Sequence, residues 1–259
     1  MVRGLELTID GPIARITLDR QDAGNAIDRD MAEALMNFAI TCDEDSRVRC
    51  VLITGRGRMF CAGGDVDGFR RAGDRLPNYV KEVTGFLHLA VSRFARMQKP
   101  LITAVNGPAA GAGFSLAILG DIVLAASSAS FTLAYSAIGL TPDGGASWLL
   151  PRLVGLRKAQ EILLLNPRIL ADEALRCGLV TRVVPDSDLE EAANKIATTL
   201  ASSATSALGE ARRLLLDSAT APLETQLELE SRTIAAQSRN AEGREGIAAF
   251  LEKRAPNYS

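Results

Sequence analysis

The stretch from residue 99 to residue 143 constrains the fold of this chain most strongly. It begins with a short apolar run at 101–105, which predicts a strand covered on both faces. Asn106-Gly107-Pro108 ends that strand, and small residues from Gly111 onward predict the start of a helix. The first N–H groups of such a helix have no partner within it and carry the positive end of its dipole. The sequence therefore predicts that a negatively charged atom binds at this turn.

Length and composition exclude several classes of function. The 259 residues are enough for one large core with a small appendage. A net charge of -2 without a basic block gives no reason to expect a nucleic-acid partner. No apolar run reaches about 18 residues, the length of a membrane helix, and the chain does not begin with a signal-peptide pattern. The four cysteines contain no C-x-x-C pair, so we expect reduced thiols, a cytoplasmic location and no membrane association.

The chain contains a single histidine, His88. A Ser-His-Asp triad, a multi-histidine metal site and an H-E-x-x-H motif are therefore nearly excluded, and we expect no metal. His88 lies within a predicted helix, where we expect a packing or surface role.

Strands and helices alternate along the first two thirds of the chain and predict an α/β fold. Strands are expected at 5–9, 13–18, 50–54, 101–105, 122–125, 131–133 and 180–184, and helices at 28–42, 77–97, after 143, after 156, and at 171–177, 189–201, 205–217, 222–238 and 240–254. The first two strands form a hairpin, and the runs 122–125 and 131–133 form a strand pair. Residues 66–80 include a variable loop, in which 68–73 is expected to be mobile. The repeating order of strand, strand and helix over about 180 residues favours a coiled stack of similar layers over a doubly wound sheet.

Two glycine-containing turns share one design. Ala62-Gly63-Gly64 follows the strand at 50–54, and Gly111-Ala112-Gly113 follows the strand at 101–105. Small residues allow backbone N–H groups to approach a ligand closely. Each turn alone is well explained as a tight connection between elements. If both face one cavity, they donate two hydrogen bonds to one oxygen, which is the arrangement of an oxyanion hole.

Nucleotide-binding motifs fit the second turn poorly. The dinucleotide fingerprint requires a third glycine where this chain has Leu116, and the next strand lacks an acid at the ribose-binding spacing. No G-x-x-x-x-G-K-[ST] motif is present in the sequence. Both common nucleotide-binding interpretations are therefore disfavoured.

Six motifs together resemble the crotonase (enoyl-CoA hydratase/isomerase) superfamily. They lie at 60–65 (FCAGGD), 99–113 (KP through NGPAAGAG), 120–122 (GDI), 151–155 (PRLVG), 171–180 (ADEA to GLV) and 245–254 (EGI to FLEKR). The resemblance covers essentially the whole chain. It implies a crotonase-like (ClpP/crotonase) spiral of ββα turns, with an acyl-CoA site in a core at 1–200 and a C-terminal helical oligomerisation region at 201–259. It also implies acyl-CoA thioester substrates, a homotrimer or dimer of trimers, and no cofactor apart from the coenzyme A of the substrate.

The resemblance also assigns candidate site residues. The N–H groups of Gly64 and Ala112 would hold the thioester oxygen, although the family more often has glycine at the second position. The positions implied to contact substrate or coenzyme A are Ala26, Ala62, Gly63, Asp65, Ser115, Tyr135, Phe250 and Lys253. In some relatives the two C-terminal positions reach coenzyme A across a subunit boundary. Asp65 has a second interpretation as a helix cap or turn former, because aspartate commonly plays that role after glycines.

The reaction depends on which groups move protons. Hydratases of this family activate water with two glutamates, and Ser115 and Tyr135 occupy those positions here. Neither side chain is a general base near neutral pH, so simple hydration is disfavoured. Residues 139–152 resemble the isomerase branch, closest to the ring 1,2-epoxyphenylacetyl-CoA and Δ3,Δ2-enoyl-CoA isomerases, in which an aspartate at the place of Asp143 moves the proton. An aspartate before a helix can also be an N-cap, but the absence of both glutamates favours the catalytic role.

Three functions remain open at this point. An isomerase moves a double bond from 3-enoyl-CoA to 2-enoyl-CoA, or isomerises a ring epoxide, in fatty acid metabolism or phenylacetate catabolism. A hydratase, classed as a lyase, adds water and would need a base other than the two missing glutamates. An acyl-CoA binding protein without activity would keep Gly64 and Ala112 but would not exchange the proton at carbon 2.

Overall fold

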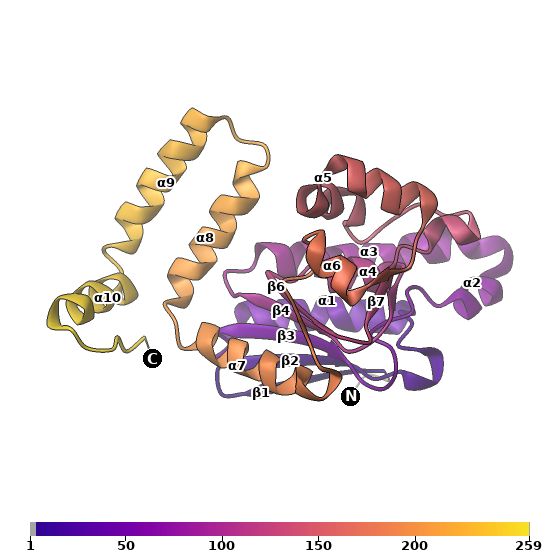
Figure 1. The fold of residues 1–259 in the computed structure, drawn as a ribbon, viewed down its shortest axis with the longest axis horizontal. Helices are drawn as coiled ribbons and strands as arrows, with labels where there is room; N and C mark the ends of the chain where they lie inside the picture. The colour runs from indigo at the N-terminus through magenta and orange to yellow at the C-terminus, as the bar shows by residue number, and fades with distance from the viewer. Residues whose placement is uncertain (1–3, 259) are drawn as a thin grey trace.

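The larger of two sheets begins with a hairpin. The computed structural model describes residues 4–258, in which β1 (Leu5–Asp10) and β2 (Ile13–Leu18) pair antiparallel, as predicted. β2 then pairs in parallel with β3 (Cys50–Gly55), and the sheet continues through three further parallel strands (Figure 1). These strands are β4 (Leu101–Val105), β6 (Ile122–Ala126) and β9 (Arg182–Val184). The strand order is therefore β1-β2-β3-β4-β6-β9.

A smaller sheet contains β5 (Ala109–Ala110), β7 (Ser130–Thr132) and β8 (Ile169–Leu170), in the order β5-β7-β8. Successive turns of the chain contribute one strand to each sheet, β4 and then β5, β6 and then β7. The expected pairing of 122–125 with 131–133 is therefore wrong. Both edges of β6 are occupied by β4 and β9, and β7 lies between β5 and β8, so the chain passes from one sheet to the other between them.

The helices follow the predicted order, and α2 is the one helix that the sequence analysis does not predict. Their bounds are α1 Arg29–Glu44, α2 Val66–Ala72, α3 Leu76–Arg96, α4 Ala112–Ala117, α5 Ala146–Leu165, α6 Ala171–Arg176, α7 Leu189–Ala201, α8 Thr205–Ser218, α9 Leu223–Gln237 and α10 Ala241–Glu252. Gly155, with φ 77°, interrupts α5, so its two halves correspond to the two helices expected after residues 143 and 156.

The expected loop at 66–80 is wrong, because α2, a short 3-10 turn (Gly73–Arg75) and the start of α3 occupy it. The Asp65 side chain accepts a hydrogen bond from the Gly68 N–H and caps α2. Pro77 lies in the first turn of α3, where its missing N–H has no cost. Two local starting signals therefore make this segment helical despite its glycines.

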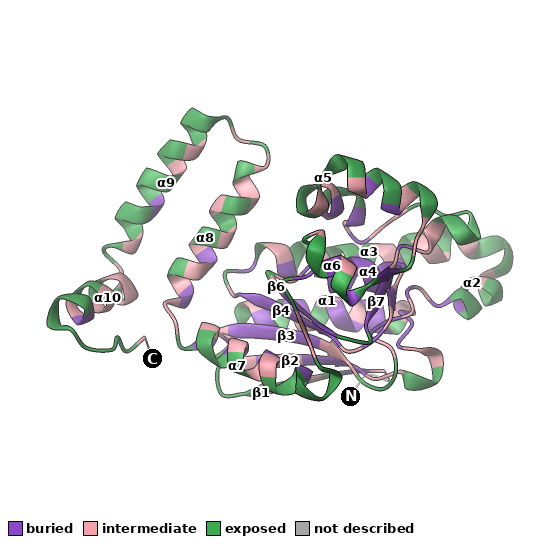
Figure 2. Ribbon diagram, viewed as in Figure 1, coloured by how far each residue is buried: buried purple, intermediate pink, exposed green. Residues whose placement is uncertain are grey.

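The core is centred on the parallel strands. Residues 50–53 of β3 have no exposed surface, as expected for a strand covered on both faces. α7 packs across β2, β3, β4 and β6, while α1 and α3 pack against each other. Figure 2 shows the strands largely buried, α9 largely exposed, and α8 and α10 with exposed and half-buried residues mixed.

The C-terminal helices extend away from the sheets but are tied to them through Arg212 of α8 (Figure 1). The Arg212 guanidinium donates to the carbonyl oxygens of Phe94 (2.9 Å) and Lys99 (2.8 Å) and also to that of Met97. Only 11% of the Arg212 side chain is exposed. The division of the chain at residue 200 stays a prediction.

Candidate active site

The two glycine turns lie in direct backbone contact. Cys61 and Ala109 form a parallel bridge, and the Ala110 N–H donates to the Cys61 carbonyl oxygen at 2.9 Å. A Cβ atom on Gly63 would lie 2.9 Å from the Ala110 oxygen and 3.4 Å from the Gly111 Cα. Gly63 also has φ 105°, a conformation that favours glycine. The turns can therefore approach this closely only because residue 63 lacks a side chain.

Each turn contains one predicted oxyanion donor, the N–H group of Gly64 in the first and of Ala112 in the second. Next to Gly64, the Gly63 oxygen accepts from the Ile27 N–H at 2.7 Å, and the Asp65 N–H donates to the Ile27 oxygen at 3.0 Å. Ala112 is the first residue of α4, so its N–H has no partner within the helix. Within residues 4–258, the N–H groups of Gly64 and Ala112 make no hydrogen bond to protein atoms. The oxyanion role of these two groups stays a prediction, and their contiguous turns are consistent with it.

Phe69 of α2 covers the first turn. The tip of its ring, Cζ, lies 3.0 Å from the position that a Cβ on Gly64 would occupy. The ring also makes an edge-to-face contact with Tyr79 of α3, with centroids 6.2 Å apart. A side chain at residue 64 would therefore collide with an aromatic pair held by two helices.

The carboxylate of Asp65 is occupied by contacts within the protein. Besides capping α2, it pairs with Arg20 and Arg71, each at 3.1 Å through Oδ2. Burial opposes ionisation, but the Gly68 N–H and the two guanidinium groups outweigh it and hold the pKa of Asp65 below 3.8. The interpretation of Asp65 as a helix cap is confirmed, whereas its predicted contact with substrate or coenzyme A stays a prediction.

Asp143 is held by the two residues that occupy the glutamate positions of family hydratases. The Tyr135 hydroxyl donates to Asp143 Oδ1 at 2.5 Å. The Ser115 hydroxyl, fully buried, donates to the Asp143 backbone oxygen at 2.9 Å and lies 3.3 Å from the Tyr135 hydroxyl. About a fifth of the Asp143 side chain, 22%, is exposed. The three predicted site residues thus form one hydrogen-bonded group, with Asp143 at its accessible end.

The Tyr135 hydroxyl remains a donor over the whole physiological pH range. Burial raises the pKa of Tyr135 above its ordinary value of 10.0, and the neighbouring Asp143 carboxylate raises it further through its charge and hydrogen bond. Tyr135 therefore stays neutral and keeps its proton directed at Oδ1.

His88 of α3 is a site residue that sequence reasoning missed. Its Nε2 atom accepts a hydrogen bond from the Gly144 N–H at 3.1 Å and lies 3.9 Å from Asp143 Oδ2. Half of the His88 side chain is exposed, which agrees with the expected surface position, and the structure adds its place beside the acid. The two partners are 56 residues apart, and no periodicity or motif links them.

The structure brings together the predicted coenzyme A positions near the N-terminus. The Ala62 N–H donates to the Gly24 oxygen at 2.9 Å, and Arg20 donates to the Ala26 oxygen at 3.0 Å. Asn25, fully buried with φ 59°, donates through Nδ2 to the Arg56, Met59 and Phe60 carbonyl oxygens. Arg20 and Asn25 were not predicted, although both hold the loop at 24–26 against the first glycine turn.

Phe250 and Lys253 are not brought to these residues within the chain. Phe250 lies in α10 and is 84% exposed, and Lys253 ends that helix. Figure 1 shows α10 at the opposite end of the molecule from α2. The predicted contact of these two residues with coenzyme A stays a prediction.

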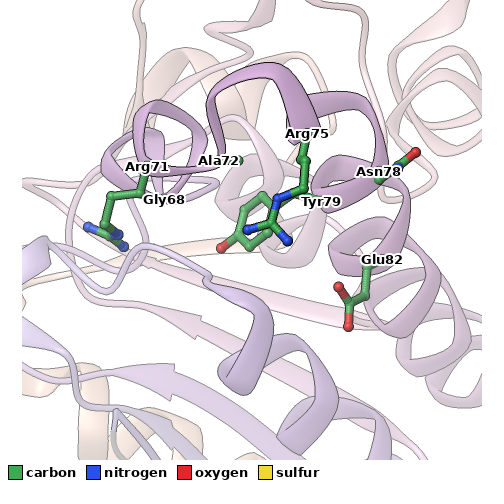
Figure 3. Close-up of a pocket in the computed structure, with 7 residues that line it drawn as sticks. All are labelled: Gly68, Arg71, Ala72, Arg75, Asn78, Tyr79 and Glu82. Carbon is green, nitrogen blue, oxygen red and sulfur yellow. The ribbon is translucent and has the colours of Figure 1, made fainter.

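A cavity of about 450 Å³ lies at the corner between α2 and α3. Figure 3 shows the guanidinium groups of Arg71 and Arg75 on the same side of this corner as the Tyr79 ring. Its lining residues are Gly68, Arg71, Ala72, Arg75, Asn78, Tyr79 and Glu82. None of these belongs to the predicted site, but Gly68 and Arg71 both contact Asp65.

Residues 4–258 contain neither a candidate metal centre nor a candidate membrane-spanning helix. No group of three or more histidine, cysteine, aspartate or glutamate side chains is arranged to hold a metal ion in this part of the chain. None of the described helices combines the length and apolar character needed to cross a bilayer.

Comparisons with known proteins agree over the whole chain. The family model for enoyl-CoA hydratase/isomerase matches residues 8–259. The chain is 38% identical over 258 residues to the 1,2-epoxyphenylacetyl-CoA isomerase of Escherichia coli strain K12, covering 97% of this chain and 96% of the relative. It is 37% identical over 267 residues to the carnitinyl-CoA dehydratase of Salmonella typhi, covering 99% and 98%.

Among solved structures, an enoyl-CoA hydratase from Polaromonas sp. JS666 superposes with a TM-score of 0.94 at 35% identity, covering 98% of this chain and 99% of that one. The predicted α/β spiral with its C-terminal helical region is confirmed by this similarity.

Proposed function

The chain belongs to the enoyl-CoA hydratase/isomerase family, the crotonase superfamily, and from this we propose that it is an acyl-CoA isomerase. Its reaction would convert a 3-enoyl-CoA into the conjugated 2-enoyl-CoA. The observation that carries the proposal is the 2.5 Å hydrogen bond from Tyr135 to Asp143. The position of one hydratase glutamate holds a neutral donor, and that donor orients the only carboxylate of the hydrogen-bonded group.

The first part of the proposed mechanism is binding of the thioester. The N–H groups of Gly64 and Ala112 would donate two hydrogen bonds to the carbonyl oxygen. Loss of the proton at carbon 2 moves an electron pair toward this oxygen, which becomes an enolate. Preorganised donors stabilise that charge without rearranging, and one such donor contributes roughly 3 kcal/mol to lowering the barrier.

The second part is proton transfer by Asp143. Tyr135 donates to Oδ1, whereas Oδ2 accepts no hydrogen bond from residues 4–258. We therefore assign Oδ2 as the atom that removes the proton from carbon 2. The carbonyl then re-forms, and the electron pair between carbons 1 and 2 becomes the double bond between carbons 2 and 3. The pair of the former double bond between carbons 3 and 4 takes the proton, which the same oxygen returns to carbon 4. The reaction consumes no water, and Asp143 ends as a carboxylate.

Opening of a ring epoxide is a second candidate reaction for the same pocket. The relative from Escherichia coli bears the name 1,2-epoxyphenylacetyl-CoA isomerase, and it aligns with almost the whole chain at 38% identity. A hydratase would require a base other than Ser115 and Tyr135, since neither side chain activates water at neutral pH. A non-catalytic acyl-CoA binder would have no use for an oriented Asp143.

Exposed apolar residues on the C-terminal helices support a self-association proposal. The side chains concerned are Leu215, Leu223, Leu227, Ile234, Ile247, Phe250 and Leu251. We propose that they pack between copies in a homotrimer or a dimer of trimers, which would bring Phe250 and Lys253 to the coenzyme A of a neighbouring copy. The coenzyme A of the substrate is the only coenzyme that the proposed reaction uses.

Deuterated water distinguishes these functions. The enzyme is incubated with a 3-enoyl-CoA in D₂O, and mass spectrometry locates deuterium and any added hydroxyl group. An isomerase gives 2-enoyl-CoA without a hydroxyl group, and any deuterium in it lies at carbon 2 or carbon 4. A 3-hydroxyacyl-CoA product would establish a hydratase, and recovery of unchanged 3-enoyl-CoA without deuterium would establish a binder.

The matched variant is Asp143→Asn, which keeps the size of the side chain but removes the base. We expect a loss of roughly 10²–10⁴-fold in turnover, the usual contribution of a general base. Thioester affinity should change little, because the two N–H donors are untouched. Full turnover by this variant would overturn the assignment of Asp143.

A further inference from the structure

We propose that His88 is a positioning residue that fixes the direction of the Asp143 carboxylate through the Gly144 N–H, a role that rests on the proposed function of Asp143. The imidazole does so as the neutral tautomer with its proton on Nδ1. The Nε2 atom is then an acceptor, as its 3.1 Å hydrogen bond from Gly144 requires.

The segment at 143–145 needs such an anchor because its backbone is permissive. Gly144 and Gly145 have φ values of 59° and 82°, in the region where glycine is freely accommodated. Two successive glycines allow many directions for the preceding carboxylate. Because the two glycines do not fix the direction of the carboxylate, a hydrogen bond from outside the segment is needed to select one direction.

The anchor itself is rigid. His88 lies near the middle of α3, a helix of 21 residues whose neighbouring Leu87 and Ala90 are buried in the core. Positions for Cβ atoms on Gly144 and Gly145 lie 4.0 Å from Leu87 Cδ2 and 3.6 Å from Val91 Cγ1. The loop therefore rests on one face of α3, and His88 projects from that face beside it.

His88 can affect Asp143 in two ways, and which of them applies depends on which ring nitrogen carries the proton. With Nε2 unprotonated, His88 holds Gly144 and donates nothing to Oδ2, 3.9 Å away. With the proton on Nε2, the Gly144 N–H would lose its acceptor and the new N–H would face the carboxylate. Only the first arrangement keeps Asp143 both oriented and available to the substrate.

The single histidine of the chain makes the tautomer directly measurable. A protein without a histidine tag, grown with ¹⁵N-labelled histidine, contains one imidazole, so long-range ¹H–¹⁵N spectra need no assignment. We expect the chemical shifts of a protonated Nδ1 and an unprotonated Nε2 in the free enzyme near neutral pH. Protonated Nε2 as the major form would overturn the proposal.

Two variants of similar length test the effect on catalysis. His88→Gln can place an amide oxygen near the position of Nε2, whereas His88→Met fills the space without a comparable acceptor. We expect His88→Met to lower kcat about 10- to 100-fold, the scale of a small displacement of a reacting group, and His88→Gln to restore most of it. KM should stay within about twofold in both variants, because neither alters the N–H donors.

These two measurements distinguish failure of the inference from failure of the proposed function. Equal kcat values for His88→Met and the wild type would contradict positioning, as would equal losses in both variants with lowered thermal stability. A protein with the expected tautomer that neither converts 3-enoyl-CoA nor exchanges the proton at carbon 2 would contradict the proposed function, and with it the catalytic part of the role of His88.

Discussion

The Tyr135 hydroxyl donates to Oδ1 of Asp143 at 2.5 Å, and Ser115 donates to the backbone oxygen of the same aspartate at 2.9 Å. Ser115 and Tyr135, at the positions where the resemblance places the two hydratase glutamates, therefore both hold Asp143. Each carries a neutral hydroxyl group directed at Asp143, so in the proposed function one oriented carboxylate takes the place of two. The substitution suits a reaction that moves a proton within the substrate and adds no water.

Removal of the Tyr135 hydroxyl should slow turnover. In Tyr135→Phe, Asp143 loses a hydrogen bond to a charged group, worth about 1.5–3 kcal/mol, and its carboxylate can rotate. We expect kcat to fall roughly ten- to hundredfold, with KM little changed, in steady-state assays of double-bond migration. Because the pKa of Tyr135 lies above 10.0, the wild type should show no loss of this donor up to about that pH. Unchanged kcat in the variant would show that Asp143 needs no such orientation.

The N–H group of Ala112, the second proposed oxyanion donor, can be removed with little change to the fold. Ala112 is the first residue of α4, where proline is well tolerated because the N–H has no helical partner. We expect Ala112→Pro to reduce kcat about 10²–10³-fold. Ala112→Gly, which keeps the N–H, is the control and should retain most activity. Circular dichroism checks that both variants are folded, and equal rates for the two would exclude a role for this N–H.

The Asp65 carboxylate should make stability dependent on acid pH. Its native pKa lies below 3.8, so the charge stabilises the fold above that value, and this stabilisation is lost as pH falls through the native pKa. Asp65→Asn can still accept from Gly68 but cannot form the ion pairs. We expect the free energy of unfolding to drop by about 1–2 kcal/mol at neutral pH and to depend less on pH below about 4. Urea denaturation at several pH values measures both, and parallel pH curves would contradict the assignment.

Arg212 should contribute strongly to the attachment of the C-terminal helices. Its largely buried guanidinium donates hydrogen bonds to the carbonyl oxygens of Phe94, Met97 and Lys99. We therefore expect Arg212→Met to lower the free energy of unfolding by about 2–3 kcal/mol. The neighbouring Arg213 is half exposed and pairs only with Glu210 one turn away, so Arg213→Met should cost less than about 1 kcal/mol. Chemical denaturation of both variants provides the comparison, and similar losses would contradict the tethering role.

Much of the fold follows from local sequence patterns. Short apolar runs such as 101–105 are strands because burial on both faces requires continuous hydrophobicity. The helices from Leu189 onward were also predicted within a few residues, since their apolar periodicity is regular. What the patterns do not contain is the partner of each strand. The separation of β6 and β7 into different sheets depends on the corner between them, which has no distinctive composition.

The site was predictable in its residue types but not in its contacts. Gly64, Ala112 and Asp143 stand out through turn chemistry and family resemblance. Hydrogen bonds between distant residues leave no periodic signal, so neither the Gly144–His88 contact nor the buried Asn25 could be inferred. The short helix α2 was missed for a similar reason, because its N-terminus depends on an aspartate held by Arg20 and Arg71.

The contact of Gly63 with Ala110 and Gly111 has a consequence for how activity arises during folding. The two turns follow β3 and β4, so neither layer of the spiral contains both N–H donors. A chain that has formed its first layer but not joined it to the second holds native strands and no pocket. Recovery of turnover during refolding should therefore lag behind recovery of secondary structure. The time at which turnover returns reports when the first layer packs against the second.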